Sequence, residues 1–279
     1  MAAAALAQEA QQMPFIKNLA SSDRKLRTAS LSSLQAFLAS RTALSPLDSR
    51  KLWTGLYYAL WMTDRPRPQQ ALAADLAALL FALPPACARE WLAGFWAVLG
   101  AQWPHIEALR LDKFMLLARR VFAVHVRFAR ERGFAPGKNS SSNGEGDGEG
   151  DDVALAILRE WCFDAEDRRG VALGLRLHVL DVWVDELERE GALAAAAATE
   201  EQDGAAAAAA RGFVTAVGAM VEELARKSPN KAIRERARQS FEDERLPWVD
   251  AKEHDDDEEG DDDDDEEGDD DDEWGGLDD

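Results

Sequence analysis

The sequence predicts an all-α fold, specifically a HEAT-like α-solenoid of antiparallel helix pairs. Three observations lead to this prediction. Nearly every periodic stretch has apolar residues three or four positions apart, no pair of alternating strands is evident, and proline marks most of the short joints between segments. Because no strict sequence repeat recurs at a fixed period, an irregular helical bundle is the alternative architecture.

Five helices are expected in the front half of the chain. Asp23 is placed to cap the first, which runs to about Ser40. Ser45–Pro46 gives the second helix an N-cap followed by proline in its first turn. The remaining three are separated by Pro84–Pro85 and Trp103–Pro104, and they are expected at 69–83, at 86–100 and from there to about 133.

The composition changes between residues 134 and 152, where Gly, Ser, Asn and acids dominate and predict a flexible linker or loop. Helical patterning resumes after this linker. Alanine-rich stretches on either side of 199–204 predict the tip of a helical hairpin, and Ser228–Pro229 predicts the start of a last helix. The expected helices of this half lie at 153–163, 170–190, 213–226 and about 229–238.

Composition and charge divide the chain into five segments. Residues 250–279 contain 21 Asp or Glu and one Lys, so they carry nearly all of the net charge of −21 and cannot bury apolar area. The expected segments are a flexible N-terminus (1–13), a front helical half (14–133), a linker (134–152), a back helical half (153–245) and a disordered acidic tail (246–279).

The two helical halves have opposite charge. Residues 1–139 contain 18 Lys or Arg against 9 Asp or Glu, whereas residues 140–249 contain 13 against 23. A basic front and an acidic back suggest different partners for the two ends. For the tail alone, three roles are open: competition for basic surfaces, binding of basic proteins, or solubility.

No signature of an enzyme is found, and no metal, cofactor or small-molecule substrate is expected. The four histidines show no metal-ligand spacing, and Cys87 and Cys162 suit packing better than a disulfide or zinc site. The glycine-rich stretch 144–150 lacks a lysine and carries acids that would repel phosphate. Neither a signal peptide nor an uncharged apolar run of about 18 residues is evident, so no membrane partner is expected.

A basic stripe on the long helix is the sharpest physical signal in the chain. On a helical wheel five cations lie opposite the apolar face, where they could cross an RNA backbone or an acidic protein patch. A solvated helix face is the alternative. His125 falls among the apolar residues and is expected to be a core histidine. The cations of the stripe are Lys113, Arg119, Arg120, Arg127 and Arg130.

Tryptophan is concentrated in the front half, where five of the nine lie within 51 residues. Trp61 and Trp103 stand beside helix ends, next to charge or proline. An amphipathic ring in that position can anchor a partner or stack on a base. Packing at the joints between helices is the alternative.

Two stretches resemble the hallmark segments of the nucleolar ribosomal-RNA-processing protein 1 family. The first hallmark segment, 51–66, reads KLWTGLYYALWMTDRP, and the second, 102–121, reads QWPHIEALRLDKFMLLARRV. The opening stretch FIKNLASSDRKLR is also similar to the family's first helix. Within the second segment, His105, Ala108 and Met115 depart from the family pattern, which puts single contacts there in doubt.

The resemblance implies a non-catalytic assembly factor with a helical, HEAT-like fold. Such a protein acts in the nucleolus, inside the nucleus, within early precursors of the large ribosomal subunit (pre-60S particles), during maturation of precursor rRNA. The expected partners are the particle, its other assembly factors and the precursor rRNA backbone. The predicted contact residues are Arg110, Lys113, Arg119, Arg120, Arg127, Arg130, Trp61 and Trp103. The competing hypothesis is an acidic chaperone or transport adaptor that binds basic proteins through its tail.

Overall fold

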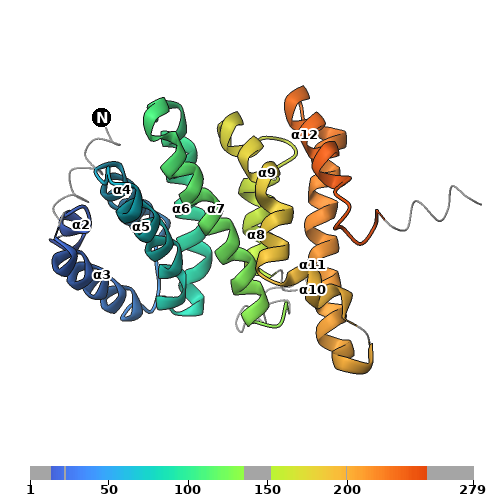
Figure 1. Cartoon of the computed structure of the whole chain (residues 1–279), viewed down its shortest axis with the longest axis horizontal. Helices are drawn as coiled ribbons and strands as arrows, with labels where there is room; N and C mark the ends of the chain where they lie inside the picture. The colour runs from blue at the N-terminus through green and yellow to red at the C-terminus, as the bar shows by residue number, and fades with distance from the viewer. Residues whose placement is uncertain (1–13, 22, 135–151, 199, 250–279) are drawn as a thin grey trace, which may run out of the picture.

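The computed structural model describes residues 14–21, 23–134, 152–198 and 200–249, and the chain is all-α over these residues. No strand occurs in the described ranges. Short 3₁₀ turns and one π-helical turn continue or join the α-helices, and Figure 1 shows the helices side by side along the long axis of the molecule. The α-helices are α2 (Pro14–Leu19), α3 (Arg24–Ala39), α4 (Pro46–Trp61), α5 (Pro66–Ala78), α6 (Ala88–Gln102), α7 (Ala108–Glu131), α8 (Val153–Ile157), α9 (Leu173–Arg189), α10 (Ala192–Ala197), α11 (Glu200–Lys227) and α12 (Lys231–Phe241).

Helix starts in the front half follow the local sequence signals. The Asp23 carboxylate accepts a hydrogen bond from the Lys25 backbone N–H at 2.8 Å and caps α3. The Ser45 hydroxyl accepts the Asp48 backbone N–H at 3.0 Å, and Pro46 occupies the first turn of α4. Each cap satisfies an N–H that has no partner inside its own helix.

Several boundaries differ from the sequence prediction. The last helix is capped by Asn230, whose side-chain oxygen accepts the Ala232 N–H at 2.9 Å, and Ser228 lies before it. Helix α5 begins at Pro66 instead of residue 69, because proline is tolerated in a first turn. Helix α11 begins at Glu200, so the break expected over 199–204 is shorter than its composition suggests.

Alternate helices pack on one another and form two layers. Helix α4 packs on α6, while α5 packs on α7, α7 on α9 and α9 on α12. From α4 to α9 these helices meet the next but one along the chain, whereas at the two ends consecutive helices pair, α2 with α3, α10 with α11 and α11 with α12. Figure 1 shows the resulting row running from α2 and α3 at one end to α11 and α12 at the other.

The front and back halves share one apolar core, because α6 contacts α8 and α7 contacts both α8 and α9. Most of the linker predicted between them lies outside the described residues. Its two described ends are not solvated: Phe134 is 9% exposed and lies 5.1 Å from the Phe213 ring, centroid to centroid, and Asp152 is 5% exposed. The Asp152 carboxylate caps α8 by accepting the Ala154 N–H.

The acidic tail begins later than position 246. Leu246 is 1% exposed, and Trp248 stacks on Phe241 with ring centroids 4.9 Å apart. These apolar side chains bury area against α11 and α12. Residues 250–279, to which the disorder prediction applies, lie outside the described residues.

By length and composition, one described helical stretch, Gly204–Lys227, could cross a membrane. Of its 18-residue apolar window, 44% is buried inside the fold. Helix α11 packs against both α10 and α12, which accounts for its apolar character.

Candidate docking edge at the junction of the two hallmark segments

The two hallmark segments meet at one end of the α4, α5 and α7 helices. The first forms α4 and the turn that leads into α5, and the second forms a short 3₁₀ turn (Trp103–His105) and the first half of α7. Lys113 joins them: its ammonium donates to the backbone carbonyls of Trp61 at 2.7 Å and Thr63 at 3.0 Å. It therefore satisfies carbonyls at the C-terminal end of α4, which no helical N–H can reach.

The helical wheel predicted that Lys113 belongs to a solvent-facing basic stripe. In the structure its side chain is buried, so that prediction is wrong for Lys113. The residue is 4% exposed, and its Nζ lies 3.7 Å from a carboxylate oxygen of Asp64. Burial lowers the pKa of the Lys113 ammonium, and the Asp64 carboxylate opposes this by raising it. A buried cation held by carbonyls and one carboxylate acts as a structural clamp between the two segments.

Aromatic rings pack beneath this clamp. Tyr57 stacks on Phe114 with ring centroids 4.6 Å apart, and Trp61 lies 6.0 Å from Phe114. The Arg110 guanidinium lies 4.9 Å from the centre of the Trp61 ring, within cation–π distance, and also pairs with Glu107. Two of the predicted contact residues, Trp61 and Arg110, are thus brought together.

Trp103 lies apart from that pair and packs at a joint between helices. A Cβ atom at Gly174 would lie 2.8 Å from its indole nitrogen, so the ring fits closely against the start of α9. Trp103 is half-buried there. This placement corresponds to the packing alternative for this residue.

The surface above the clamp mixes exposed apolar and basic side chains. Leu109 is 97% exposed and Met62 is 66% exposed, and Arg65 and Arg67 are exposed with no ion pair to the rest of the described chain. An exposed apolar patch can mark an interaction site, and these two side chains are the apolar candidates for one here. We name this surface the hallmark edge, and it consists of Trp61, Met62, Arg65, Arg67, Leu109 and Arg110.

Sequence reasoning missed the two apolar members of the hallmark edge. Leu109 falls near 320° on the wheel of α7, inside the arc that holds the basic stripe, at about 100° per residue. An apolar residue on a polar face was the signal that could have identified it. Met62 gave no such signal, because it follows the last residue of α4.

Farther along α7, the arginines of the basic stripe face acids of α9. Arg119 pairs with Asp185 at 3.2 Å and with Glu186, which is fully buried. Arg127 makes a two-bond pair with Glu190, at 2.8 Å for each bond.

The remaining two arginines of the stripe, Arg120 and Arg130, form no ion pair with a carboxylate among the described residues. Arg130 donates to the Glu190 backbone carbonyl. Arg120 forms no ion pair with the described residues, and its buried Nε has no hydrogen-bond partner there. Charges of opposite sign in the two halves of the sequence therefore meet inside the molecule, and the contact of these arginines with RNA stays a prediction.

His125 is a buried, neutral core residue. It is 0% exposed, and its Nε2 accepts a hydrogen bond from the Trp96 indole N–H at 3.0 Å. Burial lowers its pKa to about 3 because a charged ring would lose its hydration. The ring therefore stays neutral near pH 7, with its one proton on Nδ1, which has no hydrogen-bond partner among the described residues.

The described residues contain no group of three or more His, Cys, Asp or Glu placed to hold a metal ion. Cys87 and Cys162 are buried thiols that form no disulfide. Burial raises the pKa of both, so neither is a ready nucleophile.

Comparison with known proteins places these features in a family. A model of the nucleolar protein family Nop52 matches residues 10–275. Human ribosomal RNA processing protein 1 homolog B is 27% identical over 193 residues, which cover 66% of this chain and 23% of the human protein. The Drosophila melanogaster homolog is 27% identical over 186 residues, covering 64% of this chain and 25% of that protein.

A relative of the same name from Caenorhabditis elegans is 30% identical over 114 residues, covering 39% of this chain and 29% of that protein. Aligned regions thus amount to between 23% and 29% of the length of these three relatives. The family model, in contrast, matches nearly the whole chain, and the chain therefore belongs to the Nop52 family of nucleolar proteins.

Proposed function

We propose that this chain works in ribosomal RNA processing in the nucleolus, as a non-catalytic assembly factor of the early large-subunit precursor. Its family is nucleolar, and the relatives quoted above are named for ribosomal RNA processing. In this proposal the helical row is a HEAT-like scaffold and the hallmark edge is the surface that docks on the particle. The observation that carries it is the exposure of Leu109 and Met62 beside unpaired arginines.

The exposed apolar and basic side chains of the hallmark edge are suited to contact with a partner. Nothing in the described fold covers Leu109, so its side chain contributes no burial to folding. Burying exposed apolar groups against a partner supplies affinity, while Arg65 and Arg67 can meet phosphate or acidic side chains. The Lys113 clamp ties the part of this surface on α7 to the part at the C-terminal end of α4.

The basic stripe plays a smaller part in this proposal than the sequence suggested. Arg119 and Arg127 would have to leave carboxylates of α9 in order to reach RNA. Breaking a pair with a buried carboxylate has a high free-energy cost, because an uncompensated charge is left behind. Trp61 and Arg110 are the predicted contact residues that the hallmark edge retains.

The test uses the full-length, tagged chain expressed in cells, with Met62 and Leu109 both changed to Asp. Affinity purification from nuclear extract and gradient sedimentation would measure how much large-subunit precursor RNA travels with the protein. We expect recovery to fall by at least about 100-fold, since two interface side chains of this size together contribute about 3–6 kcal/mol when buried.

A matched control carries Leu47→Asp and Leu173→Asp, which add the same charges at apolar residues that are 53% and 42% exposed elsewhere. This control should sediment with precursor RNA as the wild type does. Equal recovery of precursor RNA by the edge variant and the wild type would contradict the docking surface. Recovery of histones or other basic proteins in light fractions, abolished by deleting 250–279, would instead favour the acidic-chaperone function.

A further inference from the structure

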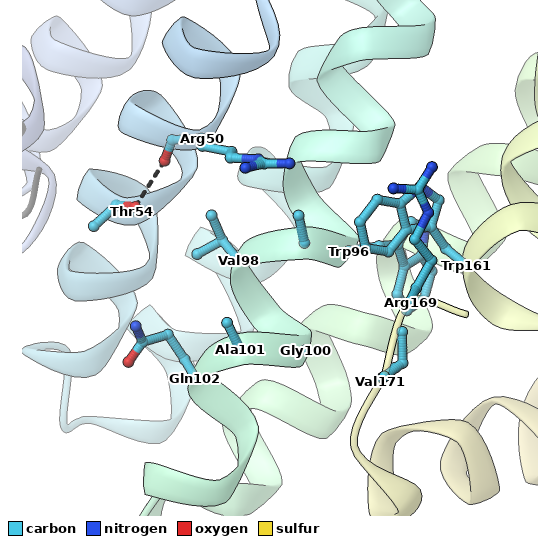
Figure 2. Close-up of a pocket in the computed structure, with 12 residues that line it drawn as sticks. Arg50, Thr54, Trp96, Val98, Gly100, Ala101, Gln102, Trp161, Arg169 and Val171 are labelled. Carbon is cyan, nitrogen blue, oxygen red and sulfur yellow. Dashed lines mark hydrogen bonds between the residues drawn. The ribbon is translucent and has the colours of Figure 1, made fainter. Parts of the chain in front are cut away.

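A groove lies on one side of α6, between α4 and the segment 161–171. Its volume is about 360 Å³, and its floor is the face of α6 that carries Ala97, Val98 and Ala101. Figure 2 shows one wall formed by Arg50 and Thr54 of α4, and the opposite wall formed by Trp161, Arg169 and Val171. The floor is apolar, and guanidinium groups stand on both walls.

A second hollow of about 210 Å³ continues this groove along α4 and α6. The two share Arg50, Trp161 and Arg169, and the second adds Arg89 and the acids Glu90 and Glu160. Arg89 and Arg169 both pair with the single Glu160 carboxylate. Arg50 forms no ion pair within the described residues, so the groove as a whole offers cationic charge to an acidic ligand.

The groove also holds an unsatisfied donor. Trp161 is 7% exposed, and its buried indole N–H has no hydrogen-bond partner in the described part of the chain. The face of its ring is already covered by the Arg169 guanidinium, 4.9 Å from the ring centre. A nucleic acid base would have to displace that arginine in order to stack, whereas a peptide could insert a side chain on the apolar floor and leave it in place.

We propose that this groove binds residues 273–279 of the same chain, whose sequence is EWGGLDD. Within 250–279 the apolar residues are Ala251, Trp274 and Leu277, and acids surround the last two. Trp274 or Leu277 lies on the floor of α6, and the neighbouring carboxylates face the cations on the walls. The segment thereby occupies a groove of its own scaffold, and this inference is independent of the function proposed above.

The length of the intervening chain permits this contact. Residues 250–273 separate the last described residue, Val249, from Trp274, and that number of residues can extend to about 80 Å. Packed helices lie about 8–10 Å apart, so the three steps from α6 through α8 and α11 to α12 amount to roughly 30 Å. The segment can therefore reach the groove without any change in the fold.

Covalent attachment also makes modest affinity sufficient. A tethered segment meets its site at an effective concentration on the order of 1 mM. An intrinsic Kd of about 0.1 mM would then leave the groove about 90% occupied. Raising the salt concentration should release the segment, because its exposed charges are screened.

The test is hydrogen–deuterium exchange of the full-length protein, followed by mass spectrometry of peptides that cover 271–279 and 97–102. We expect the amides of 274–277 to exchange about 10-fold more slowly than in a free peptide of the same sequence. Trp274→Ala, at a residue outside the described ranges, and Arg50→Glu, at an exposed and unpaired cation, should each abolish this protection. Arg67→Glu is the matched control and should leave it unchanged.

Exchange of 274–277 at the free-peptide rate in the wild type would overturn the proposal. Protection that grows with protein concentration would overturn it as well, since the segment would then come from a second copy. The RNA alternative is tested by adding a 12-nucleotide oligouridine. Protection of 97–102 that requires this RNA, is lost in Arg50→Glu and is unaffected by Trp274→Ala would assign the groove to RNA instead.

Discussion

The two ends of α7 carry the same kind of charge and use it differently. At the N-terminal end Arg110 lies over Trp61 at a surface with Leu109 exposed. At the C-terminal end Arg127 is held by both oxygens of Glu190. The first end leaves apolar and basic groups open to a partner, and the second is neutralised by α9.

This difference shows what a helical wheel can and cannot distinguish. A wheel separates the apolar face of α7 from its polar face, but a polar face is equally compatible with water and with a layer of acids. The opposite net charges of the two halves of the sequence suggest separate partners, but in the structure they partly form an internal interface. Complementary charge within one chain is therefore a reason to test for internal pairing first.

Removing the clamp should have the largest effect on stability. Lys113→Ala leaves two carbonyls at the end of α4 without their charged donor, so we expect the free energy of unfolding to fall by about 3 kcal/mol. Chemical denaturation of the full-length chain measures this change. Lys113→Met keeps most of the stem and should lose nearly as much, whereas a loss under 0.5 kcal/mol, comparable to that expected for Arg67→Ala, would contradict a clamp.

Reversing one charge at the other end of α7 should have the next largest effect. Arg127→Glu places two carboxylates together where Glu190 is 5% exposed, and we expect unfolding free energy to fall by about 2 kcal/mol, allowing for solvent screening of the half-exposed arginine. Combining it with Glu190→Arg should restore at least half of the loss in a double-mutant cycle. Strictly additive losses would mean that the pair contributes nothing.

His125, on the apolar face between the two ends of α7, should make the stability of the fold depend on pH. The pKa of His125 is lowered to about 3 in the folded chain, whereas the unfolded chain binds this proton near pH 6.5. The contribution of neutral His125 to the free energy of unfolding is therefore fully present above pH 6.5, and it is lost as the pH falls below that value. His178, whose pKa is lowered mainly by burial, acts in the same direction.

Thermal or chemical unfolding between pH 6.5 and pH 5 measures this loss, which for each histidine is at most about 1.4 kcal/mol per pH unit. His125→Gln removes one titrating group and retains an acceptor for the Trp96 indole N–H. Its stability should therefore decline less steeply than that of the wild type over this range. Identical pH profiles for the two proteins would mean that His125 is protonated without cost.

The smallest expected effect is at the open end. Leu109→Asp should change the free energy of unfolding by less than about 0.5 kcal/mol, because the side chain is 97% exposed and an acid in the first turn suits the helix dipole. Leu117, which is 1% exposed on the same helix, provides the contrast. If only Leu117→Asp unfolds the protein, Leu109 makes no contribution to the core. An equal loss of unfolding free energy in both variants would contradict the exposure of Leu109.

Local signals predicted several of the helix starts, because a cap acts through neighbours in sequence. Asp23 and Ser45–Pro46 are examples. Such signals failed where two competed, as at Ser228 and Asn230, and where distant packing extended an element. Leu246 is an example of the second kind: acids follow it, yet it is buried against the last helices.

The candidate site was predicted less completely than the fold. Both hallmark segments contribute to the hallmark edge, and Trp61 and Arg110 are the predicted contact residues that lie on it. Lys113 was assigned to the surface, since nothing in its local sequence shows that the carbonyls of Trp61 and Thr63 lie 2.7 and 3.0 Å from its ammonium. Leu109 and Met62 were missed because their exposure depends on which neighbours leave them uncovered.

The sequence by itself determined that this chain is helical, that it divides into oppositely charged halves and that it carries the hallmarks of its family. These properties depend on the types and spacing of nearby residues. Only the tertiary structure decided which cations are buried, which are paired and which remain open to a partner. The physical reason is that the free energy of a charge depends on its solvent exposure and on groups 50 to 70 positions away, such as Lys113 with Trp61 and Arg127 with Glu190.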